Sequence, residues 1–388
     1  MINLPLSSDT WDIKEREAIQ SVLDSNMFTM GKQVARYEKS FSRFFGAKYT
    51  VMTSSGSAAN LLMIAALFYT KIPKLKKSDE IIVPSIGWST TFFPLQQMGL
   101  KVKFVDVDKE TLNFDVKQLA EAISSDTKAI LAVNILGNPN DFDAIKACVN
   151  GKDIIVLEDN CESMGAVFQG QKAGTFGLMG TFSSFFSHHI ATMEGGCVVT
   201  DDEELFHVLL CLRAHGWTRD LPKHNLVTGT KSDDPFEESF KFVLPGYNVR
   251  PLELSGAIGV EQLKKLPDLV SSRRDNGARF LEVFSNNEIY SVQKELGLSS
   301  WFGFAMIIKE GANVSRREVV AKLTENGVEC RPIVTGNFLN NEVIKFFDYE
   351  VSGNLDNANH IDKYGFFIGN SHNDLKKEIY GIKNVLGG

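Results

Sequence analysis

The sequence predicts an α/β protein, with a mostly parallel, doubly wound sheet in its larger part and a smaller α+β part after it. Apolar segments alternate with helical segments over the first two-thirds of the chain. Several of these segments are continuous apolar runs, which are typical of strands buried on both faces of a parallel sheet. The composition changes after Arg219, where proline, glycine and charged residues become frequent. Because 388 residues exceed a typical single domain, we expect two domains, residues 1–245 and 246–388.

Seven strands are expected in the larger domain, and their alternation with helices favours the doubly wound architecture. They are residues 49–54, 80–84, 102–107, 129–135, 154–158, 181–185 and 197–200. Helices are expected at 57–68, between the second and third strands, and at 203–215.

The rest of the chain predicts a loop, then alternating helices and strands. Pro222, Gly229 and Pro235 favour a loop over residues 221–238. After it we expect helices at 252–265, 316–326 and 374–386, and strands at 303–308 and 328–333.

Charge and cysteine content exclude several classes of protein. A net charge of −7 and a pI near 5.6 argue against nucleic acid as the main partner. No apolar run approaches the ~20 residues of a membrane span, and the N-terminus does not resemble a signal peptide. The five cysteines, an odd number without a CxxC pair, are expected to be reduced thiols. These features predict a cytoplasmic enzyme without partners among membranes or nucleic acids.

Candidate binding residues follow the predicted strands. Residues 54–60 join a strand to a helix, so Gly56 and Ser57 could offer backbone N–H groups to a phosphate, although a serine N-cap is also ordinary there. Asp159 ends a buried strand and could pair with a cationic ring nitrogen, or else cap a helix. Trp88 could stack on a ring or lie in the core. Ser183 could contact a phosphate or be an ordinary strand residue.

Two further segments carry polar groups. Asn248 and Arg250 could reach an anion, or belong to a turn before the next helix. His188 and His189 are adjacent, and no carboxylate or third histidine stands at ligand spacing, so we expect no metal site.

Taken in order, five motifs resemble the DegT/DnrJ/EryC1/StrS family of sugar aminotransferases and dehydratases, which are fold-type I enzymes that use pyridoxal phosphate (PLP). The motifs are GKQVARYE (31–38), SGSAA (55–59), ED (158–159), EGG (194–196) and GYNVR (246–250). The similarity covers nearly the whole chain. It implies an aspartate aminotransferase-like fold whose large domain binds PLP.

The resemblance also implies roles for individual residues. Gly56, Ser57 and Ser183 correspond to phosphate contacts, Asp159 to the partner of the pyridine nitrogen and Trp88 to the stacking aromatic residue. Glu162 stands where family members place a glutamine near the ring oxygen of the cofactor. Asn248 corresponds to a phosphate contact from a second subunit, which implies a homodimer with shared active sites.

The chain departs from the family at the cofactor lysine. Counting back eight residues from Gly196 leads to His188, and imidazole cannot form a stable Schiff base but can move protons near neutral pH. Two dehydratase branches are similar in this respect. One acts on CDP-linked 4-keto-6-deoxyglucose and carries a [2Fe–2S] cluster; the other acts on GDP-linked 4-keto-6-deoxymannose without a cluster. Neighbouring cysteines here are at least 13 residues apart, which favours the second branch.

This branch implies a lyase reaction of colitose and lipopolysaccharide O-antigen biosynthesis. L-Glutamate converts noncovalently held PLP to pyridoxamine phosphate (PMP), and the C3 hydroxyl of GDP-4-keto-6-deoxy-D-mannose is removed to give GDP-4-keto-3,6-dideoxy-D-mannose. His188 is the expected acid and base, with an ordinary pKa of about 6.5. Candidate sugar-nucleotide contacts are His215, Arg219, Arg250, Glu329 and Arg331.

Three alternatives stay open from the sequence. One is a CDP-linked 3-dehydrase. Another is an aminotransferase with a displaced lysine, although the nearest upstream lysine is Lys172. The third is a noncatalytic PLP-binding scaffold, against which the retained Asp159, Trp88, Ser183 and Asn248 argue.

Overall fold

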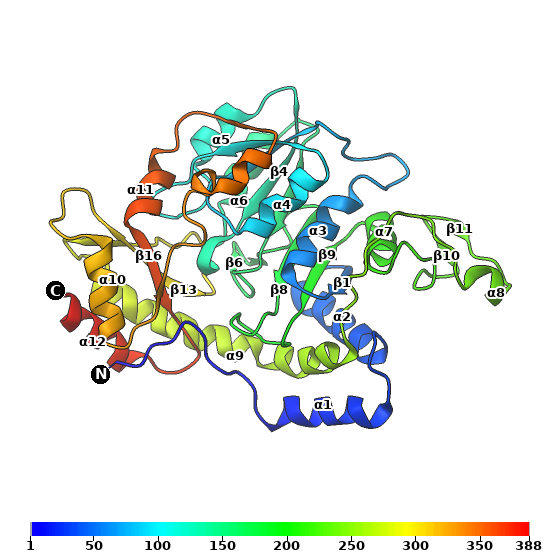
Figure 1. Ribbon diagram of the computed structural model, residues 1–388, viewed down its shortest axis with the longest axis horizontal. Helices are drawn as coiled ribbons and strands as arrows, with labels where there is room; N and C mark the ends of the chain where they lie inside the picture. Colours follow the sequence, from blue (N-terminus) through cyan, green and yellow to red (C-terminus); the bar gives the residue numbers. More distant parts are fainter. Residues whose placement is uncertain (1, 388) are drawn as a thin grey trace.

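The computed structural model describes residues 2–387 and contains one large sheet between two layers of helices (Figure 1). In spatial order the strands are β1 (Tyr49–Thr53), β9 (Gly196–Thr200), β8 (Met179–Ser183), β5 (Ile155–Asp159), β4 (Thr127–Val133), β2 (Glu80–Pro84), β3 (Lys101–Val105) and β15 (Tyr349–Val351). Only β9 runs antiparallel to its neighbours among these described strands. The predicted α/β class with a mostly parallel sheet is confirmed.

The predicted number of seven strands is wrong by one. The seven strands expected from the first 245 residues all form, but β15 from the last third of the chain adds an eighth at the edge, parallel to β3. Lys103 explains part of this pairing, since its Nζ lies 2.8 Å from Oε1 of Glu350 on β15 and 2.8 Å from Oε2 of Glu80 on β2. An ion pair between distant segments has no local signal in the sequence.

Helices cover both faces of the sheet because most strands are apolar on both sides. One face packs against α3 (Gly56–Ala66), α4 (Ser89–Gln97) and α7 (Glu203–Arg213). The other packs against α2 (Lys32–Phe45), α5 (Val116–Ala122), α6 (Phe142–Val149) and the first half of α9 (Glu253–Phe284). Outside α9 lies α1 (Ile13–Ser25), which begins at an Asp12–Glu15 capping box.

A second, antiparallel sheet follows, in the order β12 (Tyr290–Val292), β13 (Gly303–Ile308), β16 (Gly365–Gly369) and β14 (Cys330–Arg331). The core beside this sheet contains Leu4 and side chains of three helices. These are the second half of α9, the helix α10 (Arg316–Glu325) and the helix α12 (Lys376–Leu386). The helix α11 (Asp356–Tyr364) packs between the two sheets' cores, beside η1 (Ile135–Gly137). Shorter elements are β6 (Val167–Phe168), β7 (Gln171–Lys172), η2 (Phe338–Asn340) and η3 (Glu342–Phe346).

The segment predicted as a loop, residues 221–238, is an arm that projects from the end of α7 (Figure 1). It contains the short hairpin of β10 (His224–Asn225) and β11 (Gly229–Thr230), followed by α8 (Pro235–Glu238). Thr218 Oγ1 donates to Glu238 Oε2 at 2.7 Å and thereby ties the end of the arm to its base.

Candidate active site

One cavity of about 660 Å³ lies at the carboxyl ends of several strands of the large sheet. The segments after β1, β2, β4, β5 and β8 form most of its walls, while β14, Phe302 and Phe367 contribute from the antiparallel sheet. Leu6 and Ser7 of the N-terminal segment also line it. Ligands of open α/β sheets bind at this edge, and the volume is typical of a small-molecule site.

The structure brings together nine of the predicted site residues in this cavity. They are Gly56, Ser57, Trp88, Asp159, Glu162, Ser183, His188, Glu329 and Arg331. No lysine is among the lining residues found within residues 2–387.

Four predicted residues do not line the cavity: His215, Arg219, Asn248 and Arg250. They lie together where α7 ends and the arm begins. Ala214 and Asn248 form an isolated β-bridge, and Arg250 Nε donates to Asn248 Oδ1 at 3.0 Å. The guanidinium of Arg219 lies 4.1 Å from the ring centre of Trp217. The contacts predicted for these four residues stay predictions.

The start of α3 presents backbone donors to the cavity. The Ser55 hydroxyl accepts from Ala58 N at 3.1 Å and caps the helix, while the N–H groups of Gly56 and Ser57 have no acceptor within the helix. Gly56 is required because a Cβ there would lie 2.6 Å from Ser183 Cβ and 3.1 Å from Cys161 Sγ. The close approach of α3 to β8 places helix N–H groups next to the Ser183 hydroxyl, an arrangement suited to phosphate.

Asp159, at the end of β5, is held by three hydrogen bonds. Its Oδ2 accepts from Asn60 Nδ2 at 2.8 Å and from Thr91 Oγ1 at 2.6 Å. Its Oδ1 accepts from Cys161 N at 3.1 Å. Because a carboxylate offers about four lone-pair sites, Oδ1 can accept another donor from the cavity. A protonated ring nitrogen fits this requirement.

Asn60 and Thr91 are site residues that the sequence analysis missed. Besides donating to Asp159, Asn60 accepts at Oδ1 from Thr181 Oγ1 at 2.6 Å, so it links three elements. A signal for Asn60 was present, since it is the one amide in a helix of otherwise small and apolar residues. Phe302, Leu6 and Ser7 had no such signal, because only the tertiary fold places them at the cavity.

His188 lies in the loop after β8. Its ring packs edge-on against Phe302, with ring centres 5.2 Å apart, and lies 6.0 Å from the ring of Phe185. Nδ1 is buried and has no hydrogen-bond partner within residues 2–387. Nε2 is therefore the ring nitrogen available to the cavity.

The expectation of an ordinary pKa for His188 is wrong. Burial, and then the charge of Arg273, lowers the pKa of its imidazole to about 4. Arg273 is itself buried and donates hydrogen bonds to backbone oxygens of Trp301, Phe302 and Asn370. No local pattern indicated that Arg273 would lie near His188. At neutral pH the ring is neutral and can act as a base.

Glu162 shows the opposite shift. Its Oε2 accepts from Leu136 N at 3.0 Å, and the exposed part of the side chain faces the cavity. Burial raises the pKa of Glu162 to about 7; the Leu136 hydrogen bond opposes the rise and the charge of Asp159 adds to it.

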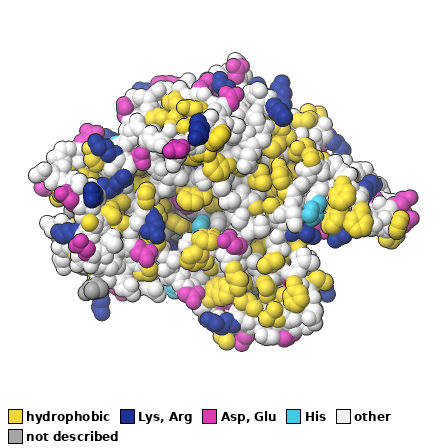
Figure 2. Space-filling model, in the orientation of Figure 1, with side chains coloured by type: hydrophobic (Ala, Val, Ile, Leu, Met, Phe, Trp, Pro, Cys, Tyr) yellow, Lys and Arg dark blue, Asp and Glu magenta, His cyan; other side chains and the backbone are white. Residues whose placement is uncertain are grey.

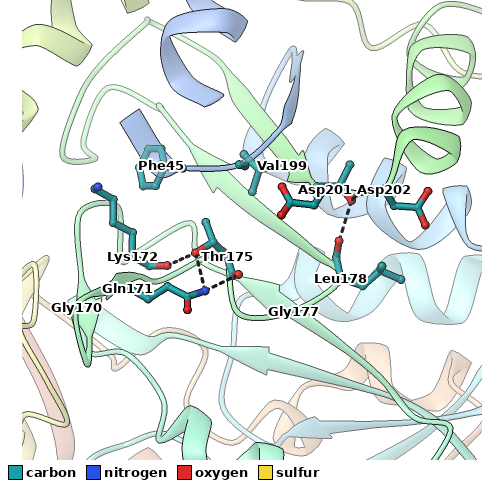
Figure 3. A pocket seen from close by; sticks show the side chains of 14 residues that line it. Phe45, Gly170, Gln171, Lys172, Thr175, Gly177, Leu178, Val199, Asp201 and Asp202 are labelled. Atoms are coloured by element: carbon teal, nitrogen blue, oxygen red, sulfur yellow. Dashed lines mark hydrogen bonds between the residues drawn. The ribbon is translucent and has the colours of Figure 1, made fainter. Parts of the chain in front are cut away.

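A second cavity, of about 490 Å³, lies where β9 ends and β8 begins (Figure 3). It is at the amino end of β8, whereas the first cavity is at the carboxyl end of that strand. Gln171 Nε2 donates to Thr175 O at 2.8 Å, and Thr175 Oγ1 donates to Lys172 O at 2.7 Å. No predicted site residue lines this cavity.

Within residues 2–387, no group of three or more His, Cys, Asp and Glu side chains is placed to hold a metal ion. The five cysteines form no disulfide there. Over the same residues, no helix has both the length and the apolar character needed to cross a membrane.

Residues 10–379 match the model of the DegT/DnrJ/EryC1/StrS aminotransferase family. The chain belongs to this family. The resemblance inferred from the five motifs is confirmed over nearly the whole chain.

Within the DegT/DnrJ/EryC1/StrS family, the chain is similar to proteins named as 3-dehydratases. It is 66% identical to GDP-4-keto-6-deoxy-D-mannose 3-dehydratase from Yersinia pseudotuberculosis, over 100% of this chain and 98% of the relative. A solved structure of GDP-4-keto-6-deoxymannose-3-dehydratase with a trapped PLP-glutamate geminal diamine has a TM-score of 0.98 and 65% identity, over 99% of this chain and 100% of that one. A solved H188N mutant of the enzyme with bound GDP-perosamine has the same TM-score, identity and coverage. The predicted aspartate aminotransferase-like fold is confirmed, with the eighth strand as its correction.

Proposed function

We propose that this chain is a PLP-dependent sugar-nucleotide 3-dehydratase. Its substrate is GDP-4-keto-6-deoxy-D-mannose, its amino donor is L-glutamate, and its product is GDP-4-keto-3,6-dideoxy-D-mannose. The observation that carries the proposal is the imidazole of His188 in a cavity that also contains Asp159 and Ser183 and has no lysine among its described lining residues. The 66% identity with a relative of that name supports the choice of substrate.

The cavity fits PLP or PMP held without a covalent bond. The N–H groups of Gly56 and Ser57 and the hydroxyl of Ser183 would hold the phosphate, and the free acceptor site on Asp159 Oδ1 would hold the protonated ring nitrogen. Trp88, whose side chain lines the cavity and is 55% exposed, can stack on the ring. When bound, the cofactor supplies an electron sink for breaking bonds next to the sugar carbon that it carries.

His188 provides the proton transfer. Neutral at physiological pH, it can accept a proton at Nε2, and the resulting imidazolium can give that proton to the departing C3 hydroxyl, which leaves as water. Phe302 and Phe185 pack edge-on against the ring and restrict its orientation. A lysine amine could instead bind the cofactor covalently and favour amine transfer.

We also infer a homodimer with shared active sites. Exposed apolar side chains gather over α1 and the nearby start of α9, and on the arm and the residues just after it (Figure 2). They include Ile13, Met27, Phe28, Leu252, Phe236, Phe240 and Phe242. Patches of this kind are typical of protein interfaces. The group of Asn248, Arg250, His215 and Arg219 lies at the base of the arm. Light scattering should give twice the chain mass of 43.1 kDa; a particle of 43.1 kDa at micromolar concentration would contradict the dimer.

A cytoplasmic location stays a prediction.

The nitrogen balance of the reaction tests the proposed function. A dehydratase forms one 2-oxoglutarate from glutamate and releases one ammonia for each sugar nucleotide consumed. An aminotransferase forms 2-oxoglutarate but keeps the nitrogen on the sugar. Equal yields of 2-oxoglutarate and ammonia are expected; 2-oxoglutarate without ammonia would favour the aminotransferase.

A further inference from the structure

Gln262 of α9 is fully buried, and its side-chain amide joins three separate segments of the chain. Its Oε1 accepts from Ala191 N at 3.0 Å and from Thr10 Oγ1 at 2.7 Å. Its Nε2 donates to Thr10 O at 3.1 Å and to Glu15 Oε1 at 2.8 Å. Because an amide has two donors and two acceptor sites, every hydrogen-bonding site of this side chain is used.

These partners also fix which way round the amide stands. The backbone N–H of Ala191 can only donate, whereas the carbonyl oxygen of Thr10 can only accept. A reversed amide would point its NH₂ group at a donor and its oxygen at two acceptors, which is costly in a buried place. The geometry therefore requires an acceptor that faces Ala191 and a donor that faces the N-terminal segment.

The contact with Ala191 matters because the loop that carries His188 has few other hydrogen bonds. Residues 186–190 form the middle of the loop between β8 and β9. Within residues 2–387, His188 is the one member of this group whose backbone N–H donates, to Phe185 O at 2.9 Å. The side chain of His189 adds a hydrogen bond between its Nε2 and Ser300 O at 3.0 Å.

Ala191, three residues after His188, is the next residue of the loop whose backbone N–H is held. Gln262 accepts from this N–H, and Trp11 Nε1 donates to the carbonyl oxygen of Ala191 at 2.8 Å. We propose that Gln262 is a positioning residue for the dehydration, because by holding Ala191 it sets the place of the His188 ring in the cavity. The proposal rests on the proposed function, in which His188 transfers the proton.

The variant Gln262→Met tests this role in turnover, since it keeps the length of the side chain but removes the amide. A small displacement of a reacting group can cost a large part of the rate, so kcat should fall about tenfold to a hundredfold. The KM for the sugar nucleotide and the dissociation constant for PMP should stay within about threefold, because the residues proposed to bind them are unchanged. A kcat close to that of the wild type would overturn the proposal.

The matched control is Lys265→Met, because Lys265 holds the same N-terminal segment. Its Nζ lies 3.3 Å from Thr10 O, 2.7 Å from Glu15 Oε1 and 2.9 Å from Asp12 Oδ2, and within residues 2–387 it has no hydrogen bond to the His188 loop. Its kcat should stay within about threefold of the wild type. Equal losses of kcat in Lys265→Met and Gln262→Met would mean that Gln262 acts through the N-terminal segment, and would overturn the proposal.

Hydrogen exchange of the Ala191 amide tests the contact without cofactor or substrate. In cofactor-free protein with isotope-labelled alanine, NMR should show this amide exchanging about tenfold faster in Gln262→Met than in the wild type or in Lys265→Met. Equal exchange rates in Gln262→Met and the wild type would overturn the proposal. A wild-type protein without turnover would instead contradict the proposed function, while a faster exchange in Gln262→Met would still establish the hold on the loop.

A double substitution serves if Gln262→Met does not fold. Gln262→Glu combined with Glu15→Gln exchanges an amide and a carboxylate across their 2.8 Å contact, keeps the net charge and leaves an acceptor oxygen for Ala191 N–H. Exchange at Ala191 and kcat should both stay within about threefold of the wild type. Loss of protection at Ala191 with an unchanged kcat would overturn the proposal.

Discussion

Burial shifts the pKa values of His188 and Glu162 in opposite directions, because one group is a base and the other an acid. Removal from water disfavours the charged form of each group, so it lowers the pKa of the imidazole and raises that of the carboxyl group. The cavity therefore holds, in His188, a proton acceptor that is neutral at physiological pH. Asp159 accepts three hydrogen bonds, which hold its carboxylate in place at the end of β5.

Replacing His188 by asparagine should remove catalysis but not cofactor binding. Asparagine fills part of the space of the ring but cannot take up a proton, so turnover should fall by about 10²–10⁴-fold. The residues proposed to hold the phosphate and the ring nitrogen are unchanged, so the dissociation constant for PMP should stay within about threefold. Steady-state kinetics and fluorescence titration would check both values, and near-normal turnover would remove His188 from the mechanism.

The protonation of His188 can be followed directly by NMR in the cofactor-free protein. Its ring resonances, identified by their absence in His188→Asn, should stay in the neutral form from about pH 8 down to about pH 5 and titrate near pH 4. The sign follows from burial beside Arg273, which disfavours imidazolium. A midpoint at or above the ordinary value of about 6.5 would contradict this account of the cavity.

At the scale of elements, α9 and β15 show what local patterns can and cannot predict. The helix predicted at residues 252–265 continues to Phe284, although Pro267 would ordinarily interrupt it. It persists because its first half packs in the core beside the large sheet and its second half in the core beside the small one. The edge strand β15 depends on partners about 250 residues away, which no window of sequence contains.

The candidate site also has residues that sequence patterns could predict and a property that they could not. Gly56 and Asp159 were predictable from the strand pattern, because the carboxyl ends of parallel strands meet on one side of a sheet. Ser183 and His188 were singled out by the resemblance to the family, and both line the same cavity. The low pKa of His188 was not predictable, because it depends on burial by the tertiary fold and then on the charge of Arg273 of α9.

The ion pairs that join β3 to β2 and to β15 give a stability prediction. Lys103→Ala leaves Glu80, whose side chain is 4% exposed, without its cation, so we expect a loss of about 3 kcal/mol in the free energy of unfolding. Lys101→Ala is the matched control, because its partner Glu350 is 37% exposed and the loss should stay below about 1 kcal/mol. Urea denaturation of both variants measures the difference, and equal losses would refute the role given to buried Lys103.

At the scale of the whole molecule, the cavity exists because residues beside two sheets from different parts of the chain line it together. The large sheet supplies the residues proposed to hold the cofactor, and the small sheet supplies Glu329, Arg331 and Phe302. His215, Arg219, Asn248 and Arg250 stay outside this cavity within one chain, which is why the proposed dimer matters for a complete site. Motif spacing identified the individual pieces, whereas their assembly required the fold.

The mass of the sugar product tests the central claim most directly. The protein would be incubated with PLP, L-glutamate and GDP-4-keto-6-deoxy-D-mannose, and the sugar nucleotide analysed by mass spectrometry. We predict a product lighter by one oxygen atom that still carries a ketone. A product in which the ketone is replaced by an amine, with all hydroxyl groups retained, would contradict the dehydratase and leave His188 without its proposed role.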